Sequence, residues 1–391
     1  MNAERLHALL KSLSKEFIER KTAEKVITLS VALTELANNS TTATQEAFVT
    51  AKEDVETALT DSASDCFSPT WQQALKEIRG NDLCGKTLAD RIENTIQSNQ
   101  LTPAVCAQKI TEISEDFRRF TKAVRNGIFA FEEFGIGAEE LGAGECEIGI
   151  LIPRDAVDGK LYDFGKELQN LTYFFDAISE VSTGKKDPLH IRSISSSELL
   201  VFLVAGFRFC KCLAETVGTL VDLYKKVLEL KQARNDYLKK GIPENIVKQV
   251  EEHANTQMQE DIHKLSVKVV EDYYKGETGR KNELTVFVER SLGGLADRID
   301  RGYNIEIRIE QIIASSDEKE DEKAEQERLE FQKAVESIRI MAPNMQYLKT
   351  EGKPILMLSE EKTPKEKQSS GQSIQKQTVK KAKKVSKKAS R

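Results

Sequence analysis

The closest match to a chemical motif lies at residues 80–87, which read GNDLCGKT. Four residues occupy the fixed positions of the phosphate-loop pattern G-x-x-x-x-G-K-S/T: Gly80, Gly85, Lys86 and Thr87. In that motif, backbone N–H groups surround the phosphates, the lysine reaches the outer phosphates, and the hydroxyl binds magnesium. The pattern indicates a nucleotide site where the flanking elements are those of a phosphate loop.

The segment before this motif lacks the required pattern. A phosphate loop follows a buried β-strand, whereas residues 71–79 (WQQALKEIR) predict an amphipathic helix. The nearest apolar run ending in an acid that could hold the metal, residues 150–155, is interrupted by Pro153. We favour a junction between two helices, one ending at Gly80 and the next beginning near Lys86. A nucleotide-dependent enzyme is the alternative.

Other residues used in catalysis or metal binding are scattered. The four histidines form no ligand cluster, and the six cysteines include no C-x-x-C pair, so a structural zinc site is not expected. Without a secretory signal, the cysteines are predicted to be reduced and mostly buried. His190 lies near serines 195–197, but no G-x-S-x-G elbow accompanies them. We therefore predict no catalytic residue, no cofactor and no metal.

The charge is divided unevenly along the chain. Residues 362–391 contain ten Lys and one Arg against one Glu, a net charge of +10, which leaves −15 on residues 1–361 because the whole chain carries −5. Residues 376–391 contain no aromatic side chain, so they can neutralise phosphates or an acidic surface but cannot read bases. The cations expected to do so are Lys380, Lys381, Lys383, Lys384, Lys387, Lys388 and Arg391.

Residues 360–391, which we call the tail, show no apolar periodicity, so we predict that they are disordered. Three interpretations of the tail remain open. It solubilises the protein or folds back on the acidic body, it attaches non-specifically to nucleic acid, or it binds an acidic partner. No apolar run is long enough to span a bilayer, so no membrane role is expected.

The composition predicts a helix-rich protein, because 31% of residues are charged, 6% are aromatic, and glycine and proline are sparse. Apolar residues at helical spacing make residues 1–134 an all-helical region. Residues 135–144 form a glycine-rich segment that we interpret as a hinge. Residues 145–315 then alternate strand and helix patterns. The expected fold class is mainly α with a small β-sheet, an α+β arrangement.

Three stretches of the α+β unit predict strands in one small sheet: residues 146–152, a hairpin within residues 189–204, and residues 303–312. In the last stretch, isoleucines alternate with charged residues, whose side chains we expect to face solvent. A helix over residues 207–240 would be about 50 Å long. We expect it to cross between subdomains or to pack on a second copy. Residues 316–359 predict an acidic helix and a possible last strand at 354–358.

These patterns favour a non-enzymatic, cytoplasmic interaction or scaffold protein that acts through long amphipathic helices of coiled-coil type. The helices would bind a partner protein or build a homo-oligomer, and the tail would tether the protein electrostatically to nucleic acid or to an acidic partner. Two alternatives remain: an enzyme that uses a phosphate loop at residues 80–87, and a non-specific nucleic-acid-binding protein.

Overall fold

The computed structural model describes residues 3–60, 62–142, 144–195, 199–241, 243–309, 322–341, 345, 347–348 and 353–359. These residues form a predominantly helical protein with a small antiparallel sheet, which confirms the predicted fold class. The tail, predicted to be disordered, lies outside the described residues.

Helices make up the N-terminal region, in the order α1 (Ala3–Glu19), α2 (Thr22–Asn38), α3 (Thr42–Leu59), the short 3-10 helix η1 (Ala63–Cys66), α4 (Pro69–Glu77), the 3-10 helix η2 (Asn81–Leu83), α5 (Gly85–Ser98) and α6 (Pro103–Glu133). Local signals begin several of them. Thr41 and Thr44 form a reciprocal capping box before α3, and Pro69 and Pro103 occupy the first positions of α4 and α6. A shared apolar core, which includes Phe117, joins the helices.

Strands and helices follow in the order β1 (Glu145–Ile152), the 3-10 helix η3 (Arg154–Val157), α7 (Leu161–Thr183), β2 (His190–Ser195), β3 (Leu199–Gly206), α8 (Phe207–Lys239), α9 (Glu244–Tyr273), α10 (Thr278–Asp300), β4 (Asn304–Ile309) and α11 (Glu322–Met341). The strands pair antiparallel in the order β2-β3-β1-β4. The three predicted strand regions therefore do join one sheet.

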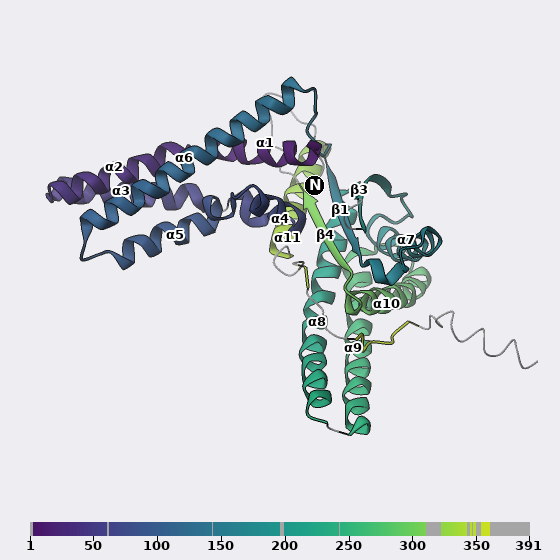
Figure 1. The fold of residues 1–391 in the computed structure, drawn as a ribbon. Coiled ribbons are helices and arrows are strands. Elements are labelled where there is room, and N and C mark those ends of the chain that lie inside the picture. The colour runs from purple at the N-terminus through teal and green to yellow at the C-terminus, as the bar shows by residue number, and fades with distance from the viewer. Residues whose placement is uncertain are drawn as a thin grey trace, which may run out of the picture.

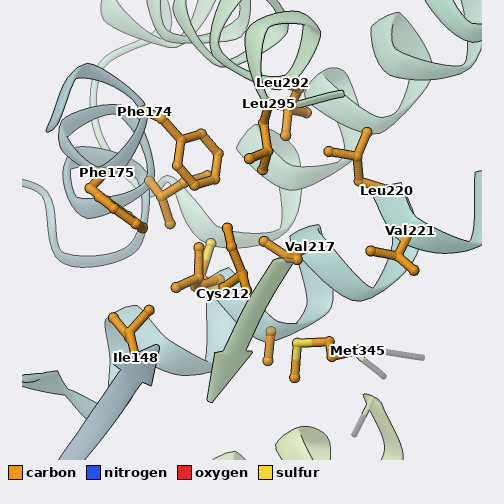
Figure 2. Packing of buried hydrophobic residues seen from close by; sticks show 14 of the residues in the cluster. Ile148, Phe174, Phe175, Cys212, Val217, Leu220, Val221, Leu292, Leu295 and Met345 are labelled. Carbon is orange, nitrogen blue, oxygen red and sulfur yellow. The ribbon is translucent and has the colours of Figure 1, made fainter. Parts of the chain in front are cut away.

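The apolar face of the sheet packs on helices. Ile148 of β1 lies in one buried cluster with Phe174 of α7, Leu220 of α8 and Leu295 of α10 (Figure 2). This cluster is the main core of the α+β unit. The alternation along β1 places Cys146, Ile148, Ile150 and Ile152 in it, as a strand with one face on the core requires.

All six cysteines are free thiols, and all except Cys66 are buried, as predicted from the sequence. Burial raises the pKa of the Cys212 thiol to about 12. Because the thiolate is the nucleophile and the metal ligand, a thiol that stays protonated at neutral pH packs as a small apolar side chain.

Helix α8 connects the sheet to a projection. It begins directly after β3, and its far half pairs with α9 across a turn in which Gly241 has a φ of 70° and Pro243 precedes α9. Its buried face contacts α7, α9, α10 and α11 of the same chain. The structure therefore shows a helix that leaves the sheet and pairs within its own chain. Packing on a second copy, the other expectation, stays a prediction.

Two helical projections leave the sheet in different directions (Figure 1). We call α2, α3, α5 and α6 the arm, and α8 with α9 the hairpin. Helices α1 and α4 lie where the arm meets the sheet.

The second face of the sheet differs from the prediction. The charged side chains of β4 were expected at solvent, but Glu306 and Arg308 are 2% and 6% exposed. The N-terminal helices cover this face: Arg308 lies over the ring of Trp71 in α4, and Thr70 donates its N–H to Glu306. Strand alternation shows which side chains share a face, but it does not show what packs on that face.

The predicted last strand is also corrected. Residues 353–359, which we call the strap, form no regular secondary structure and pair with no strand of the sheet. They lie instead against α9 and α10, where side chains take the place of a neighbouring strand.

Candidate functional site

The phosphate-loop match lies at a junction between helices. Gly80 ends α4 by donating its N–H to the carbonyl of Leu75 at 2.8 Å, and Gly85 begins α5 with a φ of 49°. Lys86 and Thr87 are exposed in the first turn of α5. The element before the loop is therefore the helix that the sequence favours, and the strand that a phosphate loop needs is not at this position.

A carboxylate of the chain already lies at the N-terminus of α5. Asp65 accepts the backbone N–H of Lys86 at 2.9 Å through Oδ1. A Cβ added at Gly85 would lie only 2.3 Å from the same oxygen, which shows how closely Asp65 approaches. Helix N-termini stabilise negative charge, and here that role belongs to Asp65. A phosphate at this place would meet a negative group.

We expect no binding of nucleotide at residues 80–87. Calorimetric titration with ATP or GTP and magnesium should give no heat, and millimolar nucleotide should not raise the melting temperature. Lys86→Ala should leave the free energy of unfolding within about 0.5 kcal/mol of wild type, because Lys86 is exposed. Heat of binding that Lys86→Ala abolishes without unfolding the protein would establish the nucleotide-dependent alternative.

The predicted cations of the tail, from Lys380 to Arg391, lie outside the described residues. Their role stays a prediction. Within the described part of the chain, no group of three or more His, Cys, Asp and Glu is placed to hold a metal ion. None of the described helices is long and apolar enough to cross a membrane.

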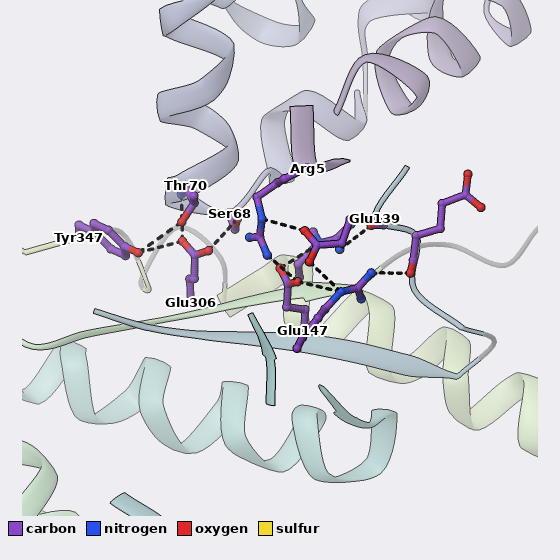
Figure 3. A network of polar contacts seen from close by, with 10 residues as sticks. Arg5, Ser68, Thr70, Glu139, Glu147, Glu306 and Tyr347 are labelled. Atoms are coloured by element: carbon purple, nitrogen blue, oxygen red, sulfur yellow. Dashed lines mark hydrogen bonds and ion pairs between the residues drawn. The ribbon is translucent and has the colours of Figure 1, made fainter. Parts of the chain in front are cut away.

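A buried ionic network fastens α1, at the base of the arm, to the sheet (Figure 3). Glu147, the third residue of β1, is 1% exposed and accepts from Arg5 of α1 at 2.8 Å and from Arg308 of β4 at 3.3 Å. Arg5 also donates to Glu139 at 3.1 Å, and Arg192 of β2 donates to Glu139 at 3.0 Å. Residues from four distant parts of the sequence therefore neutralise one another.

Glu306 forms a second part of this junction. It accepts from Ser68 at 3.3 Å, from the N–H of Thr70 at 2.9 Å and from the hydroxyl of Tyr347 at 3.1 Å. Burial raises the pKa of its carboxyl, and the bonds from Thr70 oppose that rise. Gly149 on β1 leaves the space for this side chain, since a Cβ there would lie 2.6 Å from Cγ of Glu306. We interpret the junction as structural, because its charges are committed to one another.

The strap is held by the side chains of three residues, which we call the strap-binding residues: Asn255 of α9, and Asp297 and Asp300 of α10. Asp300 accepts the N–H groups of Ile355 and Leu356 through Oδ2, at 2.5 and 2.8 Å. The side chains of Ile355 and Leu356 are buried in the main core. The middle of the strap is therefore fixed by both hydrogen bonds and apolar packing.

The other two strap-binding residues hold the remaining backbone. Asn255 donates to the carbonyl of Ile355 at 2.8 Å and accepts the N–H of Met357 at 2.7 Å. This pair of bonds reproduces what a neighbouring β-strand would offer. Asp297 accepts the N–H groups of Leu358 and Ser359, at 2.9 and 2.7 Å. The bonds go mainly to backbone groups, so they depend little on the side chains of the strap.

A buried cation lies beneath the strap. Lys231 of α8 is fully buried and donates to Oδ1 of Asp300 at 2.8 Å, and the hydroxyl of Tyr224 donates to the same oxygen at 2.7 Å. Burial, with the nearby Asp300, raises the pKa of Tyr224. Asp300 therefore receives donors from α8 through one oxygen and from the strap through the other. This carboxylate couples the hairpin to the C-terminal end of the described chain.

Sequence reasoning missed the strap-binding residues, although a signal was present. Leu292, Ala296 and Ile299 form an apolar stripe on α10, and Asp300 falls four residues after Ala296, on that stripe. An acid on an apolar stripe predicts a buried carboxylate that needs donors. Nothing in the local sequence points to the strap as their source, because it follows more than fifty residues later.

Comparison of the chain with models of protein families, with curated proteins and with solved structures gave no match.

Proposed function

We propose that the protein is a non-enzymatic interaction or scaffold protein. Its helical body, with the arm and the hairpin as projections, carries a basic tail that acts as an electrostatic tether. The observation that carries this proposal is the strap. Its backbone is bonded to α9 and α10 up to Ser359, immediately before the tail begins. A fixed attachment point at the start of the tail suits a tether, because residues 362–391 carry a net charge of +10 and bound phosphate or acidic surface is then held next to the body.

The hairpin supports the partner-binding half of the proposal. Its helices are 33 and 30 residues long, and their apolar faces are covered within the chain. Leu238 and Ile246, close to the turn on either limb, are 48% and 41% exposed. Apolar side chains at the end of a projection are accessible to a partner protein or to a second copy. We propose the hairpin end as the contact surface, with the rest of each helix as rigid support.

The charge distribution supports the tether. The acidic body repels phosphates, so the cations of the tail must supply the attraction to nucleic acid or to an acidic partner. Without base-stacking or base-reading side chains, the expected binding to nucleic acid is independent of sequence.

The test compares the full-length chain with a chain truncated after Glu361 in filter-binding titrations at two salt concentrations. If about half of the tail cations engage at once, the slope of log affinity against log salt should be roughly −4 to −6 on duplex DNA. Between 50 and 200 mM salt, the full-length protein should therefore lose roughly 250- to 4,000-fold in affinity. Truncation should abolish binding at both salt concentrations.

The matched control keeps the length of the tail and lowers the net charge of residues 362–391 from +10 to +4, by replacing the six lysines at 380, 381, 383, 384, 387 and 388 with glutamine. This variant should bind far more weakly than wild type and with a shallower salt slope. Equal retention of the full-length and truncated chains would refute the tether to nucleic acid. Retention of neither, on nucleic acid or on an acidic protein surface, would refute both forms of it.

A further inference from the structure

We propose that Ser359 is a phosphorylation site and that its phosphorylation releases the C-terminal end of the strap from α10. The release depends only on the strap and its binding residues. Any effect of this release on the tail, which begins one residue after Ser359, rests on the proposed function.

Ser359 is attached through a single carboxylate oxygen. Its backbone N–H donates to Oδ2 of Asp297 at 2.7 Å, and its hydroxyl donates to the same oxygen at 2.5 Å. The side chain of Ser359 is partly exposed, whereas Asp297 is 3% exposed. The serine hydroxyl therefore holds the edge of the strap against a carboxylate that is otherwise shielded from water.

The two carboxylates that hold the strap, Asp297 and Asp300, differ in whether a cation neutralises their charge. Asp300 pairs with the buried Lys231. In the described part of the chain Asp297 forms no ion pair, and it relies on the N–H groups of Leu358 and Ser359 and the hydroxyl of Ser359. A second negative group placed beside Asp297 would therefore be repelled without a cation to offset it. The same group beside Asp300 would meet Lys231.

Phosphorylation would place such a group there. A protein kinase joins the Ser359 oxygen to the γ-phosphorus of ATP, the bond from that phosphorus to the bridging oxygen breaks, ADP leaves, and the hydroxyl proton passes to a base. The strap then loses the hydroxyl donor to Asp297 and gains a charge of about −1.5 to −2 on the atom that had donated. Both changes disfavour the contact.

The surroundings of Ser359 suit access by a kinase. Met357 is 83% exposed, so the strap surfaces just before the serine. Glu360 and Glu361 follow in the sequence, which points to a kinase that accepts acidic residues after the target serine. Ile355 and Leu356 are buried and bonded to Asp300, so we expect the release to stop before them.

The experiment measures amide hydrogen exchange across the strap in the full-length protein, with phosphoserine incorporated at position 359 during synthesis. Exchange at Leu358 and Ser359 should rise at least about 30-fold over the unmodified chain, because placing like charges together is strongly unfavourable. Ser359→Ala, which removes only one hydrogen bond, should raise exchange by about 2- to 12-fold. Exchange at Ile355 and Leu356 should change little in both proteins.

A second variant separates repulsion from a general loss of structure. Combining phosphoserine with Asp297→Asn removes the carboxylate charge, so exchange at Leu358 and Ser359 should fall below that of the phosphorylated wild-type chain. Phosphorylated protein that exchanges no faster than Ser359→Ala would overturn the proposal, and so would phosphorylated protein that Asp297→Asn leaves unchanged. Because this assay contains no nucleic acid, its outcome is independent of whether the tail is a tether.

Discussion

Replacing Lys231 with methionine should lower the free energy of unfolding by about 3–5 kcal/mol. The lysine and its partner Asp300 are both fully buried, with 2.8 Å between Nζ and Oδ1. Methionine preserves much of the volume, so the loss comes mainly from leaving a buried carboxylate without its cation. Urea denaturation followed by circular dichroism measures the difference.

A matched control lies on the same helix. Lys225 pairs with Asp222 at 2.7 Å, but both side chains are more than 40% exposed. Lys225→Met should therefore cost about 0–1 kcal/mol. Adding Asp300→Asn to Lys231→Met should recover part of the loss, since the amide oxygen still accepts from the strap and the unpaired charge is gone. Equal stability of Lys231→Met and Lys225→Met would contradict our account of Asp300.

Replacing Arg5 with methionine should cost about 1.5–3 kcal/mol, because the buried Glu147 keeps Arg308 but loses the shorter of its two charged hydrogen bonds. Arg5 is 3% exposed, and its guanidinium lies 3.4 Å from the centre of the Phe202 ring. The substitution also weakens the connection between the arm and the sheet. We therefore expect the two parts to unfold at different urea concentrations.

Trp71 makes this separation measurable. It is the single tryptophan of the chain, and it lies in the junction under Arg308. In wild type, fluorescence and circular dichroism should report one coincident transition, and in Arg5→Met they should diverge. Lys11→Met is the control on the same helix, because Lys11 pairs with Glu140 at the surface. Coincident transitions in Arg5→Met, with a loss no larger than that of Lys11→Met, would show that the junction does not depend on the network.

The strands could be predicted from the sequence because alternation is local. Ile305 and Ile307 identify β4 without reference to any other part of the chain. The burial of Arg308 could not be predicted in this way, because it depends on Trp71 and Glu147, which lie far away in the sequence. A face of alternating charges looks the same whether water or another part of the chain covers it.

The strap and its binding residues were harder still to predict, because they are also far apart in the sequence. Residues 354–358 predict a strand because they are mostly apolar, but in the structure they form no regular secondary structure. The neighbouring sequence does not show which groups bond to the strap. The acceptors are side chains of α9 and α10, and only the position of Asp300 on an apolar stripe hints at them. The match at residues 80–87 is the opposite case, where every residue type fits and the neighbouring elements do not.

Because β1 lies between β3 and β4 in the sheet, it cannot be fully paired until β4 has been synthesised. Arg308 follows its partner Glu147 by 161 residues. At about 5–20 residues per second, a ribosome needs roughly 8–30 s to synthesise that interval. During this time β1 has an unpaired edge, and Glu147 lacks one of its cations. The helices before β1 can already have folded, because the residues of their shared apolar core all precede β1. The growing chain therefore passes through a stage with a folded arm and an unpaired strand edge, which is when its sheet is most open to pairing with other chains.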